Sequence, residues 1–515
     1  MSDVAPRFRS HVEHILDALR ENPDREALVY GDQRVTAGEF SALVHRMAWA
    51  MQAQGIERGQ TVTLLSGNLP EAVAVRYAAN LIGARVNHLY SKLAADVQAA
   101  IVRDVESRAL VVDPRMTDRA AGITGAVPVK SVLVLGPAET GEDLLALCAA
   151  QPEEPFVSQA QPDDICAIRH TGGTTGHPKG ICTTYRQVLA QRSARPFDEA
   201  AALTHRQLVA TTIAHAAGML MDAVLEYGGT VVLLDDFDAG QVLDTVERER
   251  ITHLWLLPPL LYQLLDHPRM EHTDTSTLRQ VVYGGCQASP ARLADAVRRL
   301  GPVLMQGYGQ NEAGLISTLS PDDHARPERL RSAGKILDGV EVEIRDEDGN
   351  ALPDGAHGEI VVRSDMVMQG YWKQPRLTAE ILQDGWLHTG DIGFRDADGY
   401  VTVVDRLKDM IVVVGGHVYT TELEDLLNSH PQVLQSAVFG VRDEDRMERV
   451  HAAVLLAPGA TTDAEELRAF VRAERGAMYE PAGITFPGEL PLTDVGKPDK
   501  KELRRRAAAR SAAAR

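Results

Sequence analysis

The main constraint on the fold is a regular alternation of short apolar segments with amphipathic segments in the middle of the chain. The pattern predicts a strand at 207–212, a helix at 218–227 and a strand at 230–234. It continues with helices at 239–250, 259–266 and 289–300 and with strands at 252–257, 278–283 and 303–306. Such alternation predicts parallel sheets with helices on both faces. Ligands of these sheets bind at the carboxyl ends of the strands.

The second half of the chain follows different patterns. Apolar and polar residues alternate at 340–344 and 358–363, which indicates antiparallel strands with one exposed face. After Arg406 a compact α+β pattern follows, and Thr421 with Glu424 predicts a capping box at a helix start. A chain of 515 residues is also too long for one core. We therefore predict an α/β fold with an N-terminal domain at 1–404, a hinge at 405–408 and a small α+β domain at 409–515.

Earlier in the chain the same α/β logic applies. An apolar strand is predicted at 61–65, and a helix at 70–82 begins with Pro70 in its first turn. Gly31 and Asp32 predict a hairpin turn. The large domain is therefore expected to combine parallel-sheet αβ layers with a small β-barrel-like part formed by the antiparallel strands.

Charge and composition exclude several classes of function. The 72 acidic residues exceed the 53 basic ones, and the net charge of -19 argues against a nucleic-acid partner. No apolar run approaches the roughly 20 residues of a membrane span, and the N-terminus lacks a signal-peptide pattern. The four cysteines show neither disulfide nor zinc spacing, so a cytoplasmic location is expected.

The stretch from Thr171 to Gly180 has the composition of an anion-binding loop. Its ten residues include four glycines, three threonines and Lys179. Glycines let successive backbone N–H groups turn toward one anion, and the lysine adds a positive charge. The P-loop pattern does not fit, because Pro178 precedes Lys179 and Gly180 follows it. We predict a phosphate-binding loop, with a Gly-rich surface loop as the alternative.

Two further motifs each follow a predicted strand. One begins at Tyr283, and the other runs from Tyr308 to Glu312. An aromatic residue beside glycine can stack on a purine, and the Glu312 carboxylate can help to hold Mg²⁺ against phosphate oxygens. Considered singly, each motif is also compatible with a tight turn.

The loop from Thr171 to Gly180 resembles the signature loop of the ANL superfamily, which comprises acyl- and aryl-CoA synthetases, nonribosomal peptide adenylation domains and luciferases. Further motifs follow in the family's order, among them 387–393 and 490–500. The resemblance covers nearly the whole chain. It implies an AMP-forming acid–thiol ligase that uses ATP, Mg²⁺ and coenzyme A (CoA). It also implies that the small domain is mobile and that its rotation exchanges adenylate formation for thioester formation.

The resemblance assigns roles to single residues on the nucleotide side. Asp391 and Arg406 would bind the ribose, although an aspartate after glycine is often a turn residue. Asn311 stands where the family usually has threonine in Tyr-Gly-x-Thr-Glu. The residues expected to bind ATP, AMP or CoA are Thr171, Gly172, Gly173, Thr174, Thr175, Gly176, Lys179, Gly284, Gly285, Tyr308, Gly309, Asn311, Asp391, Arg406, Gly415 and Gly416.

Four residues are expected to be catalytic by the same resemblance. Lys497 would bridge the acid carboxylate and the α-phosphate, and Lys408 would be the hinge. His215 would gate the passage between the acid pocket and the thiol tunnel, and Glu312 would be the metal ligand. Without the resemblance, Lys497 would be a solvated lysine and His215 a structural histidine.

The acid is expected to be uncharged, and aryl, fatty or otherwise bulky and hydrophobic. Amino-acid adenylating domains usually carry an aspartate near His215 for the substrate ammonium group, and there is none between Thr211 and Leu220. The expected pocket residues are Ala216, Ala217, Gly218, Met219, Tyr283, Gly307 and Ile316.

Three alternatives stay open. Asn311 motivates an enzyme that performs only one half-reaction, such as thioesterification of a preformed adenylate. A stand-alone enzyme could instead load the phosphopantetheine of a carrier protein. The third alternative is a catalytically silent ligand-binding homologue. The sequence is compatible with a homodimer and does not define the acid.

Overall fold

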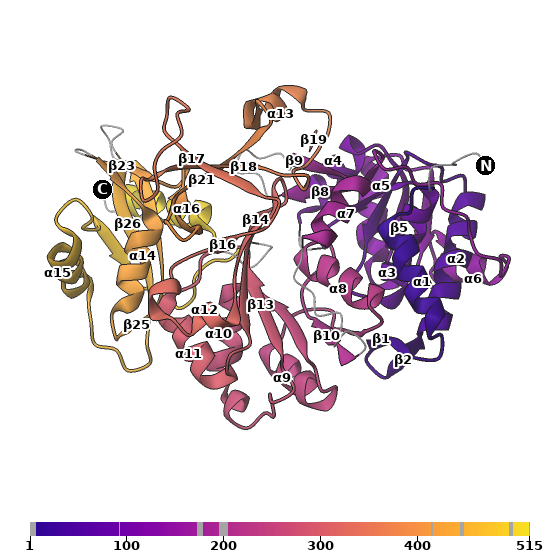
Figure 1. Cartoon of the computed structure of the whole chain (residues 1–515), viewed down its shortest axis with the longest axis horizontal. Coiled ribbons are helices and arrows are strands. Elements are labelled where there is room, and N and C mark those ends of the chain that lie inside the picture. Colours follow the sequence, from indigo (N-terminus) through magenta and orange to yellow (C-terminus); the bar gives the residue numbers. More distant parts are fainter. Residues whose placement is uncertain are drawn as a thin grey trace.

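The computed structural model describes residues 7–91, 93–171, 179–194, 204–413, 416–442, 448–493 and 498–513 (Figure 1). In this view the residues up to 194 lie on the right, residues 204–330 lie below the centre, and the C-terminal part lies on the left. Within the described ranges, no helix combines the length and the apolar character needed to cross a membrane.

The first sheet is built mainly from the N-terminal third of the chain. Its strands are β3 (Thr61–Leu65), β4 (Arg85–His88), β5 (Ser107–Val112), β6 (Ser131–Val134), β7 (Glu142–Asp143), β8 (Ile165–Thr171), β9 (Lys179–Thr184) and β19 (Gly370–Tyr371). They pair in the order β19-β9-β8-β4-β3-β5-β6-β7. Neighbours from β8 to β7 are parallel, whereas β8, β9 and β19 pair antiparallel.

Helices surround this sheet as the alternating pattern predicts. They are α1 (His11–Glu21), α2 (Ala37–Ala53), α3 (Pro70–Ile82), α4 (Ala95–Asp104), η1 (Pro114–Met116), α5 (Thr117–Ala126), α6 (Leu144–Ala149) and α7 (Tyr185–Ser193). The predicted bounds of α3 are confirmed, because Pro70 occupies its first turn and Gly83 ends it in the left-handed conformation at φ +79°. The apolar faces of α1, α2 and α3 form the largest buried cluster with β1, β3 and β11.

The second sheet joins the parallel and the antiparallel regions. Its order is β17-β18-β21-β22-β16-β15-β14-β13-β12-β10-β11-β1-β2, with β20 beside β21. The antiparallel strands, expected to be barrel-like, therefore continue the parallel sheet through the pairing of β14 with β15. The bounds are β1 (Glu26–Tyr30), β2 (Gln33–Thr36), β10 (Arg206–Val209), β11 (Thr230–Leu233), β12 (His253–Leu256), β13 (Gln280–Gly284), β14 (Leu304–Gln310), β15 (Gly314–Leu319), β16 (Gly334–Ile336), β17 (Glu341–Arg345), β18 (Gly358–Arg363), β20 (Leu382–Gln383), β21 (Trp386–Arg395) and β22 (Tyr400–Arg406).

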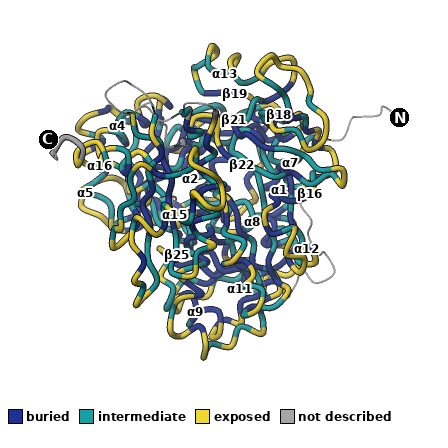
Figure 2. Tube along the Cα trace, turned by 90° about the vertical axis from the view of Figure 1, so that its left-hand side faces the viewer, coloured by how far each residue is buried: buried dark blue, intermediate teal, exposed yellow. Residues whose placement is uncertain are grey.

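The helices of this region lie close to their predicted places. They are α8 (Ala216–Glu226), α9 (Ala239–Arg248), α10 (Pro258–Asp266), η3 (Pro268–Glu271), α11 (Pro290–Leu300), α12 (Pro321–His324), η4 (Pro327–Arg329) and α13 (Pro375–Ile381). In Figure 2 the buried residues fill the middle of the molecule, and exposed residues mark outer segments such as α9 and α13. Parallel strands β10 to β14 are thereby covered by helices, as predicted.

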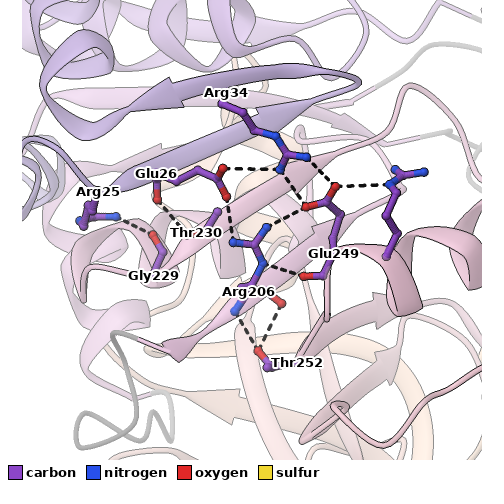
Figure 3. A network of polar contacts seen from close by, with 9 residues as sticks. Arg25, Glu26, Arg34, Arg206, Gly229, Thr230, Glu249 and Thr252 are labelled. Carbon is purple, nitrogen blue, oxygen red and sulfur yellow. Dashed lines mark hydrogen bonds and ion pairs between the residues drawn. The ribbon is translucent and has the colours of Figure 1, made fainter.

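A network of arginines and glutamates connects the β1–β2 hairpin to β10 and to the end of α9 (Figure 3). Arg34 donates from both terminal nitrogens to the two carboxylate oxygens of Glu249, each at 2.8 Å. Arg206 donates to Glu249 at 2.9 Å and to Glu26 at 2.8 Å. The hydrogen bonds from Arg34 and the positive charges nearby lower the pKa of Glu249 to about 2 although burial opposes the shift. The network therefore holds a buried carboxylate in its ionised form.

The C-terminal part has its own sheet and its own core. Its elements are the hairpin β23 (Ile411–Val413) and β24 (Gly416–Val418), α14 (Thr420–Ser429), β25 (Val433–Arg442), β26 (Glu448–Leu456), α15 (Ala464–Arg475), β27 (Gly483–Thr485) and α16 (Lys500–Ala513). Two buried clusters draw only on residues from Ile411 onward, which agrees with a small α+β domain. The exact boundary at 405–408 stays a prediction.

The predicted capping box of α14 is wrong. The helix begins one residue earlier, and its N-cap Tyr419 provides no side-chain hydrogen bond. The Glu424 carboxylate instead accepts a hydrogen bond from Val438 N–H at 2.7 Å and lies 2.9 Å from the Lys500 ammonium. Tertiary partners therefore outcompete the local cap at this position.

Candidate active site

Asp391 is a buried carboxylate where β14, β21 and β22 meet. Its Oδ2 accepts hydrogen bonds from the Tyr308 hydroxyl at 2.8 Å and from the Gln310 amide at 2.7 Å. Burial and the charge of Asp391 raise the pKa of Tyr308 well above its usual value, so the hydroxyl stays a donor. The last residues of a parallel strand thus hold an aspartate of the antiparallel region in place.

The second oxygen of Asp391 faces Arg406. Arg406 Nε lies 3.2 Å from Asp391 Oδ1, and the two residues are paired across β21 and β22. The Asp391 side chain is 4% exposed, whereas that of Arg406 is 45% exposed. A carboxylate can accept about four hydrogen bonds, so Oδ1 keeps a position for a hydroxyl donor. This geometry leaves one acceptor position for a hydroxyl group beside Arg406.

A second group joins Glu312, Tyr371 and Lys179. Glu312 lies in the turn between β14 and β15, and its Oε1 accepts a hydrogen bond from the Tyr371 hydroxyl at 3.0 Å. The Lys179 ammonium lies 5.2 Å from the centre of the Tyr371 ring, within range of a cation–π interaction. Burial and the Glu312 charge raise the pKa of Tyr371. A cation and a carboxylate therefore flank one aromatic ring at the end of the predicted phosphate loop.

Lys408 lies near both groups. Burial lowers the pKa of its ammonium, and the positive charges of Arg406 and Lys179 lower it further. Asp409 and Asp391 act in the opposite direction. The predicted hinge lysine therefore shares one electrostatic environment with the predicted ribose and phosphate residues, although these come from distant parts of the sequence.

A buried polar network connects the end of β22 to the C-terminal part. Asp405 accepts hydrogen bonds from the Thr420 N–H and, at 3.0 Å, from its hydroxyl. The Lys500 ammonium donates to the Thr420 hydroxyl at 2.7 Å and pairs with Glu424 at 2.9 Å. Burial raises the pKa of Asp405 to about 6, against the opposing effect of Lys500. Lys500 thus anchors the segment just after residue 497 to the predicted hinge.

His215 immediately precedes α8, and its ring stacks on Tyr90. The ring centres are 5.2 Å apart and the planes differ by 22°. The Tyr90 hydroxyl is buried without a hydrogen-bond partner among the described residues. Two aromatic rings, one just after β4 and one just before α8, therefore meet where the sequence predicts a single histidine gate.

Part of the predicted pocket lining belongs to the core instead. Tyr283 is fully buried, and its hydroxyl lies 2.8 Å from His324 Nε2 and donates to Gln306 at 3.1 Å. Its expected contact with a purine or an acid is therefore corrected, because its ring points into the core. Buried positions are also found for Ala217, Gly218 and Ile316, whereas partial exposure remains at Ala216, Met219 and Gly307.

Two glycines of the strand-end motifs have a packing explanation. A Cβ on Gly284 would collide with the Gly307 carbonyl, and a Cβ on Gly309 would collide with the Gly314 carbonyl. Glycine at these positions is therefore required by the close approach of neighbouring strands.

Family comparisons agree with this geometry. A family model described as AMP-binding enzyme matches residues 16–372, and one described as AMP-binding enzyme C-terminal domain matches residues 422–497. The chain belongs to the AMP-binding enzyme family. The ANL resemblance and the expected fold class are thereby confirmed.

Several relatives of this AMP-binding enzyme match along nearly all of their length. The medium/long-chain fatty acid–CoA ligase FadD8 of Mycobacterium tuberculosis is 35% identical over 97% of this chain and 90% of its own. A feruloyl-CoA synthase of an Amycolatopsis species is 35% identical over 95% of this chain and 97% of its own. The solved structure of the amide bond synthetase McbA from Marinactinospora thermotolerans is 40% identical, covers 96% of this chain and 99% of its own, and has a TM-score of 0.88.

Several predicted residues of this AMP-binding enzyme lie outside the described residues. They are Gly172, Gly173, Thr174, Thr175, Gly176, Gly415 and Lys497. For Thr171 and Gly416 the backbone alone is described, at the end of β8 and the start of β24. Asn311 lies between β14 and Glu312, partly exposed. Their roles stay predictions.

The sequence reasoning missed four residues of the site in this AMP-binding enzyme. Gln310 donates a hydrogen bond to Asp391, and Tyr371 donates one to Glu312. Tyr90 stacks on His215. Lys500 donates to Thr420 in the network around Asp405. Tyr371 is brought to the site by the pairing of β19 with β9, the strand that Lys179 begins, and this pairing leaves no signal in the sequence.

Proposed function

We propose that the chain is an acyl-CoA ligase that activates a carboxylic acid with ATP and transfers the acyl group to CoA. The observation that carries this proposal is the buried Asp391, held by Tyr308 and Gln310 and paired with the partly exposed Arg406. Such a carboxylate, with one acceptor position left, is suited to a ribose hydroxyl of a nucleotide. CoA ligases among the relatives that match over the full chain support the acceptor.

In the first half-reaction a carboxylate oxygen of the acid attacks the α-phosphorus of ATP. The bond to the bridging oxygen breaks, and pyrophosphate leaves. Asp391 would hold the ribose, and Lys179 would neutralise charge on the phosphates. Lys497 would stabilise the charge that develops between the carboxylate and the α-phosphate. Positioning and electrostatic stabilisation supply most of the catalysis in this kind of step.

Mg²⁺ fits this site through Glu312. Within the described ranges no three His, Cys, Asp or Glu side chains gather as a metal cage. Mg²⁺ is commonly held by one or two carboxylates together with substrate phosphates, so a single carboxylate at this position is sufficient. The ion would supply charge neutralisation at the phosphates.

In the second half-reaction the CoA thiol attacks the acyl carbon of the adenylate. The carbon–oxygen bond to the phosphate breaks, AMP leaves, and the thiol proton passes to solvent. Rotation of the C-terminal domain about Lys408 would withdraw Lys497 and bring Gly415 and Gly416 toward the thiol. The stacked pair of Tyr90 and His215 would separate the acid from the thiol passage.

A second candidate differs only in the acceptor. The amide bond synthetase McbA is 40% identical to this chain, compared with 35% for the CoA ligase FadD8. In this alternative an amine nitrogen attacks the same adenylate and yields an amide and AMP. In a further alternative, the phosphopantetheine thiol of a carrier protein attacks the adenylate in place of the CoA thiol.

Half-reactions measured separately test the proposal. We expect acid-dependent release of pyrophosphate from ATP, and formation of acyl-CoA from a synthetic acyl-adenylate plus CoA. Lys497→Ala should abolish the first and spare the second. Acyl-CoA from the adenylate without acid-dependent pyrophosphate release would support the single half-reaction that Asn311 motivates. Amide formation without thioester would favour the second candidate, and no turnover of either kind would indicate a silent homologue.

A further inference from the structure

A cavity lies between α1, α3, α7, α8, β4 and β8. Its volume is about 60 Å³. About 15 Å³ is enough for one water molecule, so the cavity holds a small group of atoms. Its lining is mixed and contains five charged side chains, whereas the sequence predicts an apolar pocket. Arg76, Arg169, Arg192, Asp222 and Glu226 all contribute to it.

Most of these charges are paired with each other. Arg76 donates from two nitrogens to the two oxygens of Asp222, at 3.3 and 3.1 Å. The Tyr77 hydroxyl donates to Asp222 at 2.6 Å. Arg192 forms an ion pair with Glu226. The two carboxylates of the cavity are thereby already engaged.

Arg169 is the exception. Its guanidinium donates to the Thr183 hydroxyl at 3.3 Å, and no ion pair with a carboxylate is found for it within the described ranges. Burial lowers the pKa of its guanidinium, and the nearby charge of Arg76 acts in the same direction. A guanidinium has five N–H donors, so several of them remain for a ligand.

Two further nitrogens in the cavity lack a partner. His11 is 6% exposed and its Nδ1 is unbonded within the described part of the chain, as is Arg192 Nε. Burial lowers the pKa of His11 to about 4, so the ring is neutral near pH 7. Because buried polar atoms normally find partners, these nitrogens and Arg169 indicate a missing group rich in acceptors.

The cavity adjoins the predicted acid gate. Ala214, the residue before His215, lines it, and so does Met219, whose N–H donates to the His215 carbonyl at 3.2 Å. His88 lines the cavity two residues before Tyr90, the stacking partner of His215. The cavity that contains Arg169 therefore borders the two segments that carry this aromatic pair.

We propose that this cavity binds a second carboxylate at the far end of the acid substrate, with Arg169 as its main partner. The inference rests on the proposed function and refines it, because the sequence predicts an entirely uncharged acid. The preferred substrate is then an acid with an apolar body and a carboxylate at each end. One carboxylate would be activated, and the other would complete the charge balance of the cavity.

Two matched series of acids test this inference. The first contains α,ω-dicarboxylic acids of increasing length, and the second contains monocarboxylic acids in which a branched methyl end replaces the distal carboxylate. The kcat/KM for acid-dependent AMP formation is measured for wild type, Arg169→Met and Arg169→Lys. Arg206→Met is the control, because it removes a partly buried arginine of the Figure 3 network, away from the cavity.

We expect wild type to prefer one length of dicarboxylic acid over its monocarboxylic match. Loss of a charged hydrogen-bond partner should lower kcat/KM for that diacid by about 10- to 100-fold in Arg169→Met. The matched monoacid should change little, and Arg169→Lys should keep part of the preference. Arg206→Met should leave the ratio between the two series unchanged.

Different failures have different meanings. Equal use of both series by wild type, or an equal loss for both acids in Arg169→Met, would contradict the inference and leave the proposed function intact. AMP formation from no acid in either series would contradict the proposed function itself.

Discussion

Around Glu249 every carboxylate oxygen meets an arginine, whereas around Arg169 the guanidinium lacks a carboxylate among the described residues. In the first cluster Arg34 and Arg206 both donate to Glu249, and Arg206 also donates to Glu26. In the second cluster Asp222 and Glu226 are taken up by other arginines. Removal of one partner from a balanced buried cluster is expected to destabilise the fold, whereas an unbalanced buried charge is expected to mark a ligand site.

The largest expected effect follows from removing the central charge of the balanced cluster. Glu249→Gln leaves Arg34 and Arg206 facing an amide, and we expect a loss of about 3 kcal/mol in the free energy of unfolding. Chemical denaturation measures it. Glu247→Gln is the matched control, because Glu247 is an exposed glutamate in the last turn of α9, just before Glu249. This substitution should lower the free energy of unfolding by less than about 0.5 kcal/mol. Equal effects of both changes would show that the network contributes nothing.

The same carboxylate predicts a dependence of stability on pH. The pKa of Glu249 falls from an ordinary value of 4.5 to about 2 in the folded protein. A lowered pKa means that the stabilisation is fully present above about pH 4.5 and is lost as the pH falls toward 2. Denaturation curves between pH 5 and pH 2 should therefore decline less steeply for Glu249→Gln than for wild type. Identical acid limbs would contradict the assignment.

Asp391→Asn is expected to lower the free energy of unfolding less than Glu249→Gln does, and to lower kcat/KM for ATP specifically. Asp391→Asn keeps the shape of the side chain and removes the charge that faces Arg406, so kcat/KM for ATP should fall by about 10- to 100-fold. Asp384→Asn, at an exposed turn before β21, is the control and should leave kinetics unchanged. A normal KM for ATP in Asp391→Asn would argue against ribose binding there.

The smallest effect is expected where the charge is unbalanced. Burial already disfavours the charged form of Arg169, so Arg169→Met should change the free energy of unfolding by less than about 1 kcal/mol in either direction. Arg206→Met should cost more, because it removes the hydrogen bonds that Arg206 donates to Glu249 and Glu26 and leaves Arg34 as the remaining arginine that both carboxylates share. Calorimetric melting of the two variants sharpens the comparison. A larger loss for Arg169→Met would place Arg169 in a structural role.

Much of the fold could be predicted from the sequence, because the relevant signals are local. Pro70 and Gly83 bound α3, and alternating strands and helices predict the parallel sheet. The failed capping box at Glu424 shows the limit, since Val438 and Lys500 are distant in sequence and compete for that carboxylate. Local patterns cannot show such competition.

The site could be predicted only in part for the same reason. Motifs pointed to Asp391, Arg406 and Glu312, because each stands in a recognisable stretch of sequence. Partners such as Gln310 and Tyr371 became visible only through the pairing of strands. The cavity could not be predicted because its residues come from six separate elements, and none of them stands out in the sequence.

The central claim is that the acid carboxylate attacks the α-phosphorus of ATP. The most direct test uses an acid whose two carboxylate oxygens are labelled with ¹⁸O, together with ATP and the acceptor. Because one labelled oxygen forms the bond to phosphorus and stays there when the acyl group departs, the account predicts one ¹⁸O atom in the AMP, by mass spectrometry. Unlabelled AMP with the label in pyrophosphate, or ADP with labelled inorganic phosphate, would contradict it.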